Sequence, residues 1–237
     1  MNWYSFWQKY RLVDIASDRD LLFQVGKTVN GTVINKDHYE LLVHDTVELL
    51  HLTSDDVVLD LCCGNGILTF ELSKYVSKVI GIDFSEPFIE NAKKYKSTQK
   101  IEYICADVKK LTEVDFSQLG KINKVLIYDA LAYFSYSEID LLLSQLAKVL
   151  NGKEIILFAS VLNRHKIWSF FNTLTRKLRY WIQFRLFKSN YGIGKWWLYS
   201  EFQALSEKNS FDVEIHEQDA QLYTSHYRMD VVLTGRG

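Results

Sequence analysis

The sequence predicts an α/β protein built on a doubly wound, mostly parallel sheet of seven strands, with helices on both faces. Short and almost wholly apolar runs recur between residues 57 and 159, and helical patterns separate most of them. Strands of this composition are typical of parallel sheets that are covered on both faces. Two further apolar runs near the end of the chain are joined by a loop alone, which predicts a C-terminal antiparallel hairpin.

Apolar runs indicate where the strands lie, and capping and turn residues indicate where the helices begin and end. We expect a helix over 67–76, and a second to about residue 95 that begins after Ser85 with Pro87 in its first turn. A third helix over 138–150 is ended by Asn151-Gly152, and a fourth covers 200–208. Residues 1–56 read as helical and amphipathic, most clearly over 38–52. The predicted strands are 57–61, 79–82, 101–105, 122–128, 154–159, 211–215 and 228–233.

Composition favours one intracellular domain. The chain has 237 residues, 48% of them hydrophobic, which is enough for one sizeable core. The formal net charge of −1 gives no global attraction to nucleic acid. Three cysteines do not make a disulfide framework, so we expect a reducing, cytoplasmic location. The first residues lack the apolar core of a signal peptide, and no segment approaches the length of a membrane span.

Within this single domain we expect four parts. They are an N-terminal helical cap (1–52), a core (53–162), a basic and aromatic helical insertion that acts as a lid (163–199), and the last helix with the hairpin (200–237).

The loop after the first sheet strand carries the strongest functional signal. It reads Asp60-Leu-Cys-Cys-Gly-Asn-Gly66, at the edge where open α/β sheets bind ligands. Gly64 and Gly66 permit a tight turn and a close ligand. A dinucleotide fingerprint would need a glycine where Thr69 stands, and Asp60 would repel a pyrophosphate. These two residues disfavour a nicotinamide-dependent oxidoreductase and favour a cofactor with a cationic end.

Four segments in order resemble the motifs of class I S-adenosylmethionine (SAM)-dependent methyltransferases. They are the loop after Asp60, Gly81-Ile-Asp-Phe-Ser85, Cys105-Ala-Asp-Val108 and Tyr128-Asp-Ala-Leu131, and the resemblance covers about residues 55–160. It implies SAM as cofactor, S-adenosylhomocysteine (SAH) as product, Asp83 on the ribose hydroxyls and Asp107 on the adenine amino group. The cofactor-binding residues that it implies are Asp60, Cys62, Gly64, Asn65, Gly66, Asp83, Phe84, Ala106, Asp107, Val108, Tyr128 and Asp129.

The adjacent cysteines do not need a chemical role. A structural zinc site would need further Cys or His ligands at suitable spacing, and a redox pair is usually Cys-x-x-Cys. A nucleophilic cysteine of the kind that some RNA methyltransferases use would stand beside a proline on a later strand, and the chain has only Pro87. We expect no metal, and we interpret Cys62 and Cys63 as small residues in a tight turn.

Methyl transfer from a sulfonium needs a general base only when the acceptor must lose a proton. The candidate residues at the reaction centre are Tyr133, just after the fourth strand, His165, just after the fifth, and His226, in the loop before the last strand. For each of these three residues the alternative is an ordinary packing role.

The segments outside the core should choose the acceptor. Residues 163–195 contain eight basic residues, no acidic one and many aromatics. Three interpretations stay open, namely a lid for an anionic acceptor, a solvated basic helix around an aromatic core, and a helix that contacts an anionic membrane surface. The polar segment 24–31 is expected to cap SAM, with Tyr10 as a further contact, and a surface turn is the alternative.

The leading functional hypothesis is methyl transfer to O or N of a small anionic or phosphorylated acceptor, such as a nucleotide-linked sugar. A lipid or quinone headgroup at a membrane surface is the second hypothesis, and a non-catalytic SAM-binding protein is the third. No nucleic-acid partner is expected, because Asp129-Ala-Leu131 lacks the Asp/Asn-Pro-Pro-Tyr/Phe motif of enzymes that methylate exocyclic amines.

Overall fold

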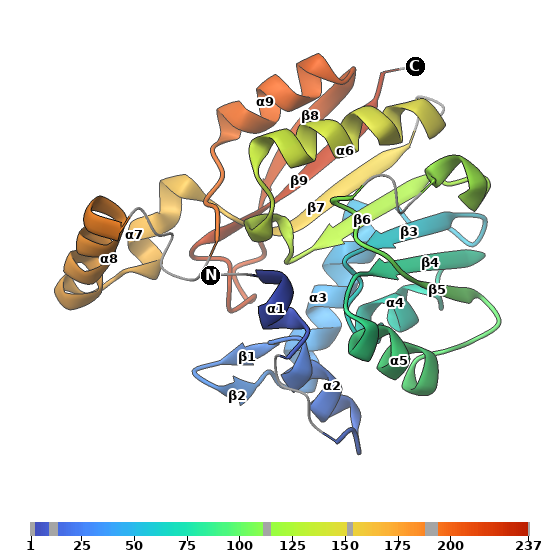
Figure 1. The fold of residues 1–237 in the computed structure, drawn as a ribbon, viewed down its shortest axis with the longest axis horizontal. Helices are drawn as coiled ribbons and strands as arrows, with labels where there is room; N and C mark the ends of the chain where they lie inside the picture. Colours follow the sequence, from blue (N-terminus) through green and yellow to red (C-terminus); the bar gives the residue numbers. More distant parts are fainter. Residues whose placement is uncertain (1–2, 10–13, 111–114, 151–153, 188–193, 237) are drawn as a thin grey trace.

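The computed structural model describes residues 3–9, 14–110, 115–150, 154–187 and 194–236. Its centre is a seven-stranded sheet in the order β5-β4-β3-β6-β7-β9-β8 (Figure 1). In this sheet β9 runs in the direction opposite to the other six strands. This confirms the predicted mostly parallel sheet with a C-terminal hairpin. The sheet strands are β3 (Val57–Leu61), β4 (Lys78–Asp83), β5 (Ile101–Cys105), β6 (Lys124–Tyr128), β7 (Ile155–Leu162), β8 (Phe211–Glu217) and β9 (Arg228–Gly235).

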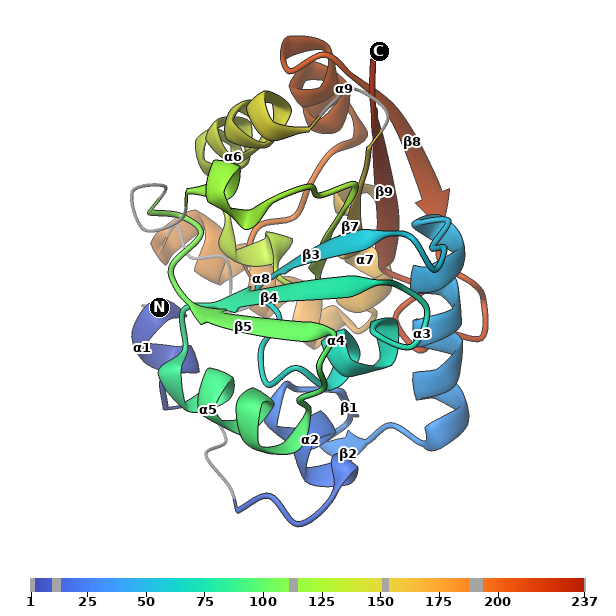
Figure 2. The ribbon, with the colours of Figure 1, turned by 90° about the vertical axis from the view of Figure 1, so that its right-hand side faces the viewer.

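Helices cover both faces of this sheet, as the apolar strands require. One face packs on α6 (Tyr136–Val149) and α9 (Tyr199–Lys208), with side chains such as Leu143 and Phe202 fully buried. The other face packs on α3 (Lys36–Leu49), α4 (Ile67–Leu72) and α5 (Glu86–Tyr95) (Figure 2). A strand with both faces buried cannot alternate polar and apolar residues, which explains the continuous apolar runs of the sequence.

The N-terminal region differs from the helical expectation at one place. It contains α1 (Trp3–Trp7) and α2 (Asp18–Gln24), but a small hairpin, β1 (Thr28–Val29) and β2 (Thr32–Val33), separates them from α3. The turn is Asn30-Gly31, and both residues have positive φ. Asn-Gly is the preferred sequence for two-residue hairpin turns, because both positions tolerate the left-handed conformation. That dipeptide signals a hairpin and not only a break in a helix.

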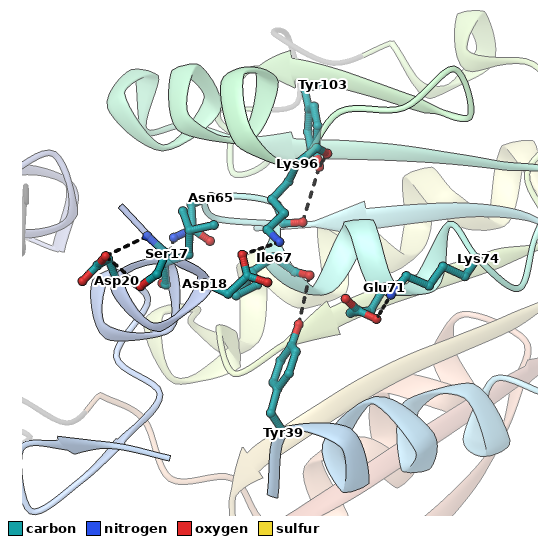
Figure 3. A network of polar contacts seen from close by, with 12 residues as sticks. Ser17, Asp18, Asp20, Tyr39, Asn65, Ile67, Glu71, Lys74, Lys96 and Tyr103 are labelled. Carbon is teal, nitrogen blue, oxygen red and sulfur yellow. Dashed lines mark hydrogen bonds and ion pairs between the residues drawn. The ribbon is translucent and has the colours of Figure 1, made fainter. Parts of the chain in front are cut away.

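The N-terminal region is tied to the loop after β3 by a network of polar contacts. The buried Asn65 side chain donates to the backbone oxygen of Leu21 and to the side chain of Gln24, each at 2.9 Å. The Tyr39 hydroxyl donates to the Ile67 backbone oxygen at 2.9 Å, and Lys96 pairs with Asp18 at 2.6 Å (Figure 3). These contacts fix the cap against the start of α4 and so place segment 24–27 beside the strand ends.

The insertion after β7 projects from the body of the molecule. It contains α7 (Ile167–Phe170) and α8 (Leu174–Phe187), which lie away from the main sheet on the left of Figure 1. Its buried aromatics, among them Phe171, Tyr180 and Trp196, form a small separate core. No helix within the described parts of the chain is long and apolar enough to cross a membrane.

Candidate active site at the carboxyl edge of the sheet

A cavity of about 430 Å³ lies at the carboxyl ends of the parallel strands. The cavity therefore lies at the sheet edge where the sequence predicts ligand binding. Its walls are formed by the strand-end turns, the first turns of α4 and α5, the N-terminal region and the first residue of β9. Ten of the predicted residues line it: Asp60, Cys62, Gly64, Asp83, Phe84, Asp107, Val108, Tyr128, Asp129 and Tyr133.

The turn after β3 is held in a left-handed conformation. Cys62 has φ 62°, Gly64 φ 59° and Gly66 φ 73°. A Cβ at Gly66 would lie 2.3 Å from the Tyr103 hydroxyl oxygen, so this glycine serves close packing and does not line the cavity. Cys62 bears the strain of a left-handed residue that is not glycine.

Both cysteines lack the chemistry of a nucleophile. Burial raises the pKa of the Cys62 and Cys63 thiols well above the usual value, and the nearby Asp60 and Asp83 add to the effect. A thiolate is the reactive form, and it is disfavoured here. Cys63 packs against Gly81 and Ala92 in a small apolar cluster. The structure thus supports the interpretation of both residues as parts of a tight turn.

Two aspartates are buried at adjacent strand ends. Asp83 accepts hydrogen bonds from the backbone N–H groups of Gly64 at 2.9 Å and Ser85 at 2.8 Å. Asp60 accepts from the Thr69 hydroxyl at 2.6 Å, so the residue that breaks the dinucleotide fingerprint holds the aspartate in place. Burial raises the pKa of Asp60 to about 7 and that of Asp83 to about 6. Ionising these carboxyls therefore costs folding stability as the pH rises from about 4 to about 7.

These carboxylates fit the donor groups of a nucleoside. Asp83 keeps lone pairs beyond its two backbone contacts, and Asp107 lines the same wall after β5. Hydroxyl and amino groups could donate to them, whereas a phosphate would be repelled. Phe84 adds an aromatic surface, on which the Tyr4 ring of α1 stacks at 4.9 Å. The residues present therefore suit an adenosine whose far end is cationic, as SAM is.

The opposite wall carries a cluster of charges that sequence reasoning found only in part. Asp129 pairs with Lys27 at 3.1 Å and with Arg228. Lys27 also lies 4.0 Å from the centre of the Tyr128 ring. Burial opposes the ionised form of Asp129, but the two cations outweigh burial and lower its pKa. Segment 24–31 pointed to Lys27, whereas nothing in the sequence distinguishes Arg228 at the start of a hairpin strand.

Several predicted residues lie outside the lining of this cavity. Asn65 binds the N-terminal region, and Gly66 packs against Tyr103. Ala106 is buried in the core. His165 packs on the Tyr199 ring at 4.8 Å, and His226 on the Tyr227 ring at 4.7 Å. Neither histidine belongs to the described lining of the cavity. Tyr10 falls outside the described residues.

None of the described residues of the insertion, 163–187 and 194–199, belongs to the lining of this cavity. Its described basic side chains are engaged or exposed elsewhere, since Lys166 pairs with Glu217 and Lys195 with Glu201. α1 lies over the strand ends instead, with Trp7 packed edge-on against Tyr133 at 5.8 Å. Tyr4, Phe6 and Trp7 of α1 thus form part of the cavity wall.

Comparison with known proteins agrees with this site. Residues 58–153 match a family described as a methyltransferase domain. An N-methyltransferase structure from Bradyrhizobium japonicum in complex with SAH has a TM-score of 0.63 at 14% identity, with 100% of both chains covered. Magnesium protoporphyrin IX methyltransferase from Synechocystis, with bound SAH, has a TM-score of 0.60 at 15% identity and covers 99% of this chain and 94% of that one.

Curated relatives are similar over shorter segments. The human tRNA (uracil-5-)-methyltransferase homolog B is 37% identical over 60 residues, which is 25% of this chain and 12% of that protein. A Legionella pneumophila 23S rRNA (uracil(1939)-C(5))-methyltransferase is 28% identical over 108 residues, which is 46% of this chain and 22% of that protein. The chain therefore spans less than a quarter of the length of these two relatives.

The family match and the fold agree with each other. Residues 58–153 match a methyltransferase domain, and the sheet has the fold of SAM-dependent class I methyltransferases of known structure. The acceptor is a separate question, because the named relatives act on acceptors as different as a porphyrin and RNA uracil.

Asp83 should make cofactor binding depend on pH. Its raised pKa of about 6 means that the carboxylate, the better acceptor for ribose hydroxyls, forms only above that pH. We expect SAH affinity to fall by up to about tenfold per pH unit below pH 6. Calorimetry with SAH between pH 5 and 8 measures this, and Asp83→Asn should lose the change in SAH affinity near pH 6.

Asp60→Ala and Asp83→Ala should each abolish SAH binding, because each removes a carboxyl group from the cavity wall. Undiminished SAH affinity in both variants would contradict the site.

Cys62→Gly should keep both the fold and cofactor binding. Glycine relieves the left-handed strain at this position, while the loss of a packed thiol and greater backbone freedom in the unfolded chain oppose it. We expect the free energy of unfolding to change by less than about 1 kcal/mol. Denaturant unfolding and SAH calorimetry test this. A folded variant that no longer binds SAH would show that the thiol itself serves the site.

Proposed function

We propose that this protein transfers the methyl group of SAM to an oxygen or nitrogen atom of a small acceptor. The observation that carries the proposal is one cavity whose two walls differ in charge. Asp60, Asp83 and Asp107 lie on the β3-β4-β5 side, and Lys27 and Arg228 flank Asp129 on the β6-β9 side. The first wall suits a cofactor with a cationic centre, and the second suits an acceptor that bears negative charge.

The chain's own residues would act mainly by binding, orientation and exclusion of water. When SAM is bound, it supplies an activated sulfonium methyl group. Asp83 would hold the ribose hydroxyls and Asp107 the adenine amino group. Tyr4, Phe6 and Trp7 of α1 close one side of the cavity with apolar surface. Tyr133, at the other wall, is placed to orient the acceptor, since holding the two reactants in line can account for much of the rate.

The proposed acceptor is small and anionic or phosphorylated, such as a nucleotide-linked sugar. A cavity of about 430 Å³ is within the range of small-molecule sites. Lys27 and Arg228 both line it, and Asp129 is the one carboxylate among the described residues that pairs with them there. Nucleic acid is not part of this proposal, because none of the described residues of the basic insertion lines the cavity.

A screen of acceptors tests this function. Purified protein with SAM should methylate at least one nucleotide sugar or phosphorylated metabolite, detected as a mass increase of one methyl group together with SAH formation. Asp83→Ala should abolish the product. Methylation of an RNA oligonucleotide by the wild type, with no turnover of any small anion, would overturn the proposal.

A second candidate is methylation of a lipid or quinone headgroup at a membrane surface. Exposed large apolar side chains gather on α7 and α8: Trp168 is 50% exposed, Leu174 86%, Leu178 59% and Trp181 55%. Leu174, Leu178 and Trp181 follow helical spacing on one face of α8, and exposed Arg176 and Arg179 lie on the same helix. Basic and bulky apolar residues together favour an anionic bilayer interface.

Vesicle sedimentation separates the two candidates. If α8 contacts a bilayer, the protein should sediment with phosphatidylglycerol vesicles and not with phosphatidylcholine vesicles. Leu178→Ser with Trp181→Ser should abolish this binding. Leu141→Ser, which alters an exposed leucine on α6, is the matched control. Equal sedimentation of all these proteins with the anionic vesicles would exclude α8 as the contact.

A further inference from the structure

The charge cluster of Lys27, Asp129 and Arg228 is built from three distant parts of the chain. Lys27 precedes β1, Asp129 directly follows β6, and Arg228 begins β9. All three side chains line the cavity and all are largely buried, with exposed fractions of 9%, 27% and 15%. Two cations thus share one carboxylate in a place where water screens little. Buried charges that are not fully compensated are costly, so they indicate a role beyond packing.

The backbone around the cluster is strained at two positions that converge on it. Asp129 has φ 58° and Ser160 has φ 60°, and neither is glycine. Ser160 also lies in the irregularity of the β7–β9 pairing between Phe158 and Val161. At this distortion the backbone oxygen of Ser160 accepts a hydrogen bond from the Arg228 side chain at 2.5 Å. Strain of this kind persists where the surrounding structure enforces it, and it gathers at functional sites.

Arg228 has hydrogen-bonding capacity that the cluster does not use. Asp129 and Ser160 both accept from the same nitrogen, Nη1. Nε is buried and has no hydrogen-bond partner among the described residues. The Tyr227 ring also contacts this guanidinium, at 5.3 Å from its centre. Because two cations meet one carboxylate at this wall, a second oxyanion could accept from the Arg228 guanidinium and the Lys27 ammonium together.

The position of the cluster assigns it to the acceptor and not to the cofactor. The predicted nucleoside contacts lie on β3, β4 and beyond β5, whereas β9 lies three strands from β3 in the opposite direction, about 14 Å along the sheet. Within the described part of the chain, Lys109 is the one other cation of the cavity lining, and it follows Asp107 on the nucleoside side. The excess of positive charge at the far wall is therefore local.

We propose that Lys27 and Arg228, which both pair with Asp129, bind one carboxylate or phosphate group of the acceptor. This inference rests on the proposed function and names the residues that would select an anionic acceptor. Asp129 is then a positioning residue, which compensates one cation and leaves the other for the incoming oxyanion. Neutral acceptors of the same shape would leave a buried cation without a partner and would bind poorly.

Inorganic phosphate is a suitable probe because the acceptor is unidentified. Calorimetry on SAH-saturated protein should detect phosphate binding in the wild type. Lys27→Met removes one charge and leaves a neutral Asp129–Arg228 pair, so phosphate affinity should fall about tenfold or more. Arg228→Lys keeps the charge but loses the fork and should weaken binding as well. Arg236→Met is the matched control, because Arg236 ends the same hairpin and pairs with exposed Asp212.

Each outcome of this experiment has a defined meaning. Unchanged phosphate affinity in Lys27→Met, or no phosphate binding by the SAH-bound wild type, would overturn the inference. The methionine carboxylate of the cofactor is the rival oxyanion. If Lys27→Met weakens SAH but not 5′-methylthioadenosine, which lacks the amino acid, the cluster serves the cofactor and the inference is wrong. A wild-type protein that does not bind SAH at all would instead refute the proposed function.

Discussion

The left-handed turn after β3 is the constraint on which the rest of the site depends. It redirects the chain into α4 within a few residues, and it does so by holding Cys62, Gly64 and Gly66 at positive φ. This conformation points the Gly64 N–H at Asp83 and the Asn65 side chain at α2. One turn therefore fixes the floor of the cavity, the orientation of the Asp83 carboxylate and the position of the N-terminal region.

The cavity separates charge along the edge of the sheet, and this separation gives each wall its chemistry. Three aspartates lie on the β3-β4-β5 side, where burial without a strong cationic partner raises the pKa of Asp60 and Asp83. On the other side, two cations flank Asp129 and lower its pKa. The same residue type therefore titrates differently a few strands apart. Parallel strands make this arrangement possible, because their carboxyl ends meet at one edge.

Among the described residues, the N-terminal region lines this cavity and the basic insertion does not. Tyr4 and Trp7 of α1 pack against Phe84 and Tyr133, and Lys27 reaches Asp129. The insertion instead forms its own aromatic core and presents exposed apolar side chains on α8. Composition alone could not separate these roles. A basic and aromatic segment reads the same whether it faces a ligand, a membrane or solvent.

The sequence by itself determined the sheet, the edge that carries the site and the strand-end aspartates, because apolar runs and turn residues act locally. Asn30-Gly31 indicates a hairpin by the same local rule, within a region whose overall pattern predicts helices. Only the tertiary structure decided that Asn65 and Gly66 serve packing, that His165 and His226 lie outside the cavity lining, and that Arg228 meets Asp129. Those outcomes depend on contacts between residues far apart in the chain, about 100 positions for Asp129 and Arg228, and no local pattern encodes them.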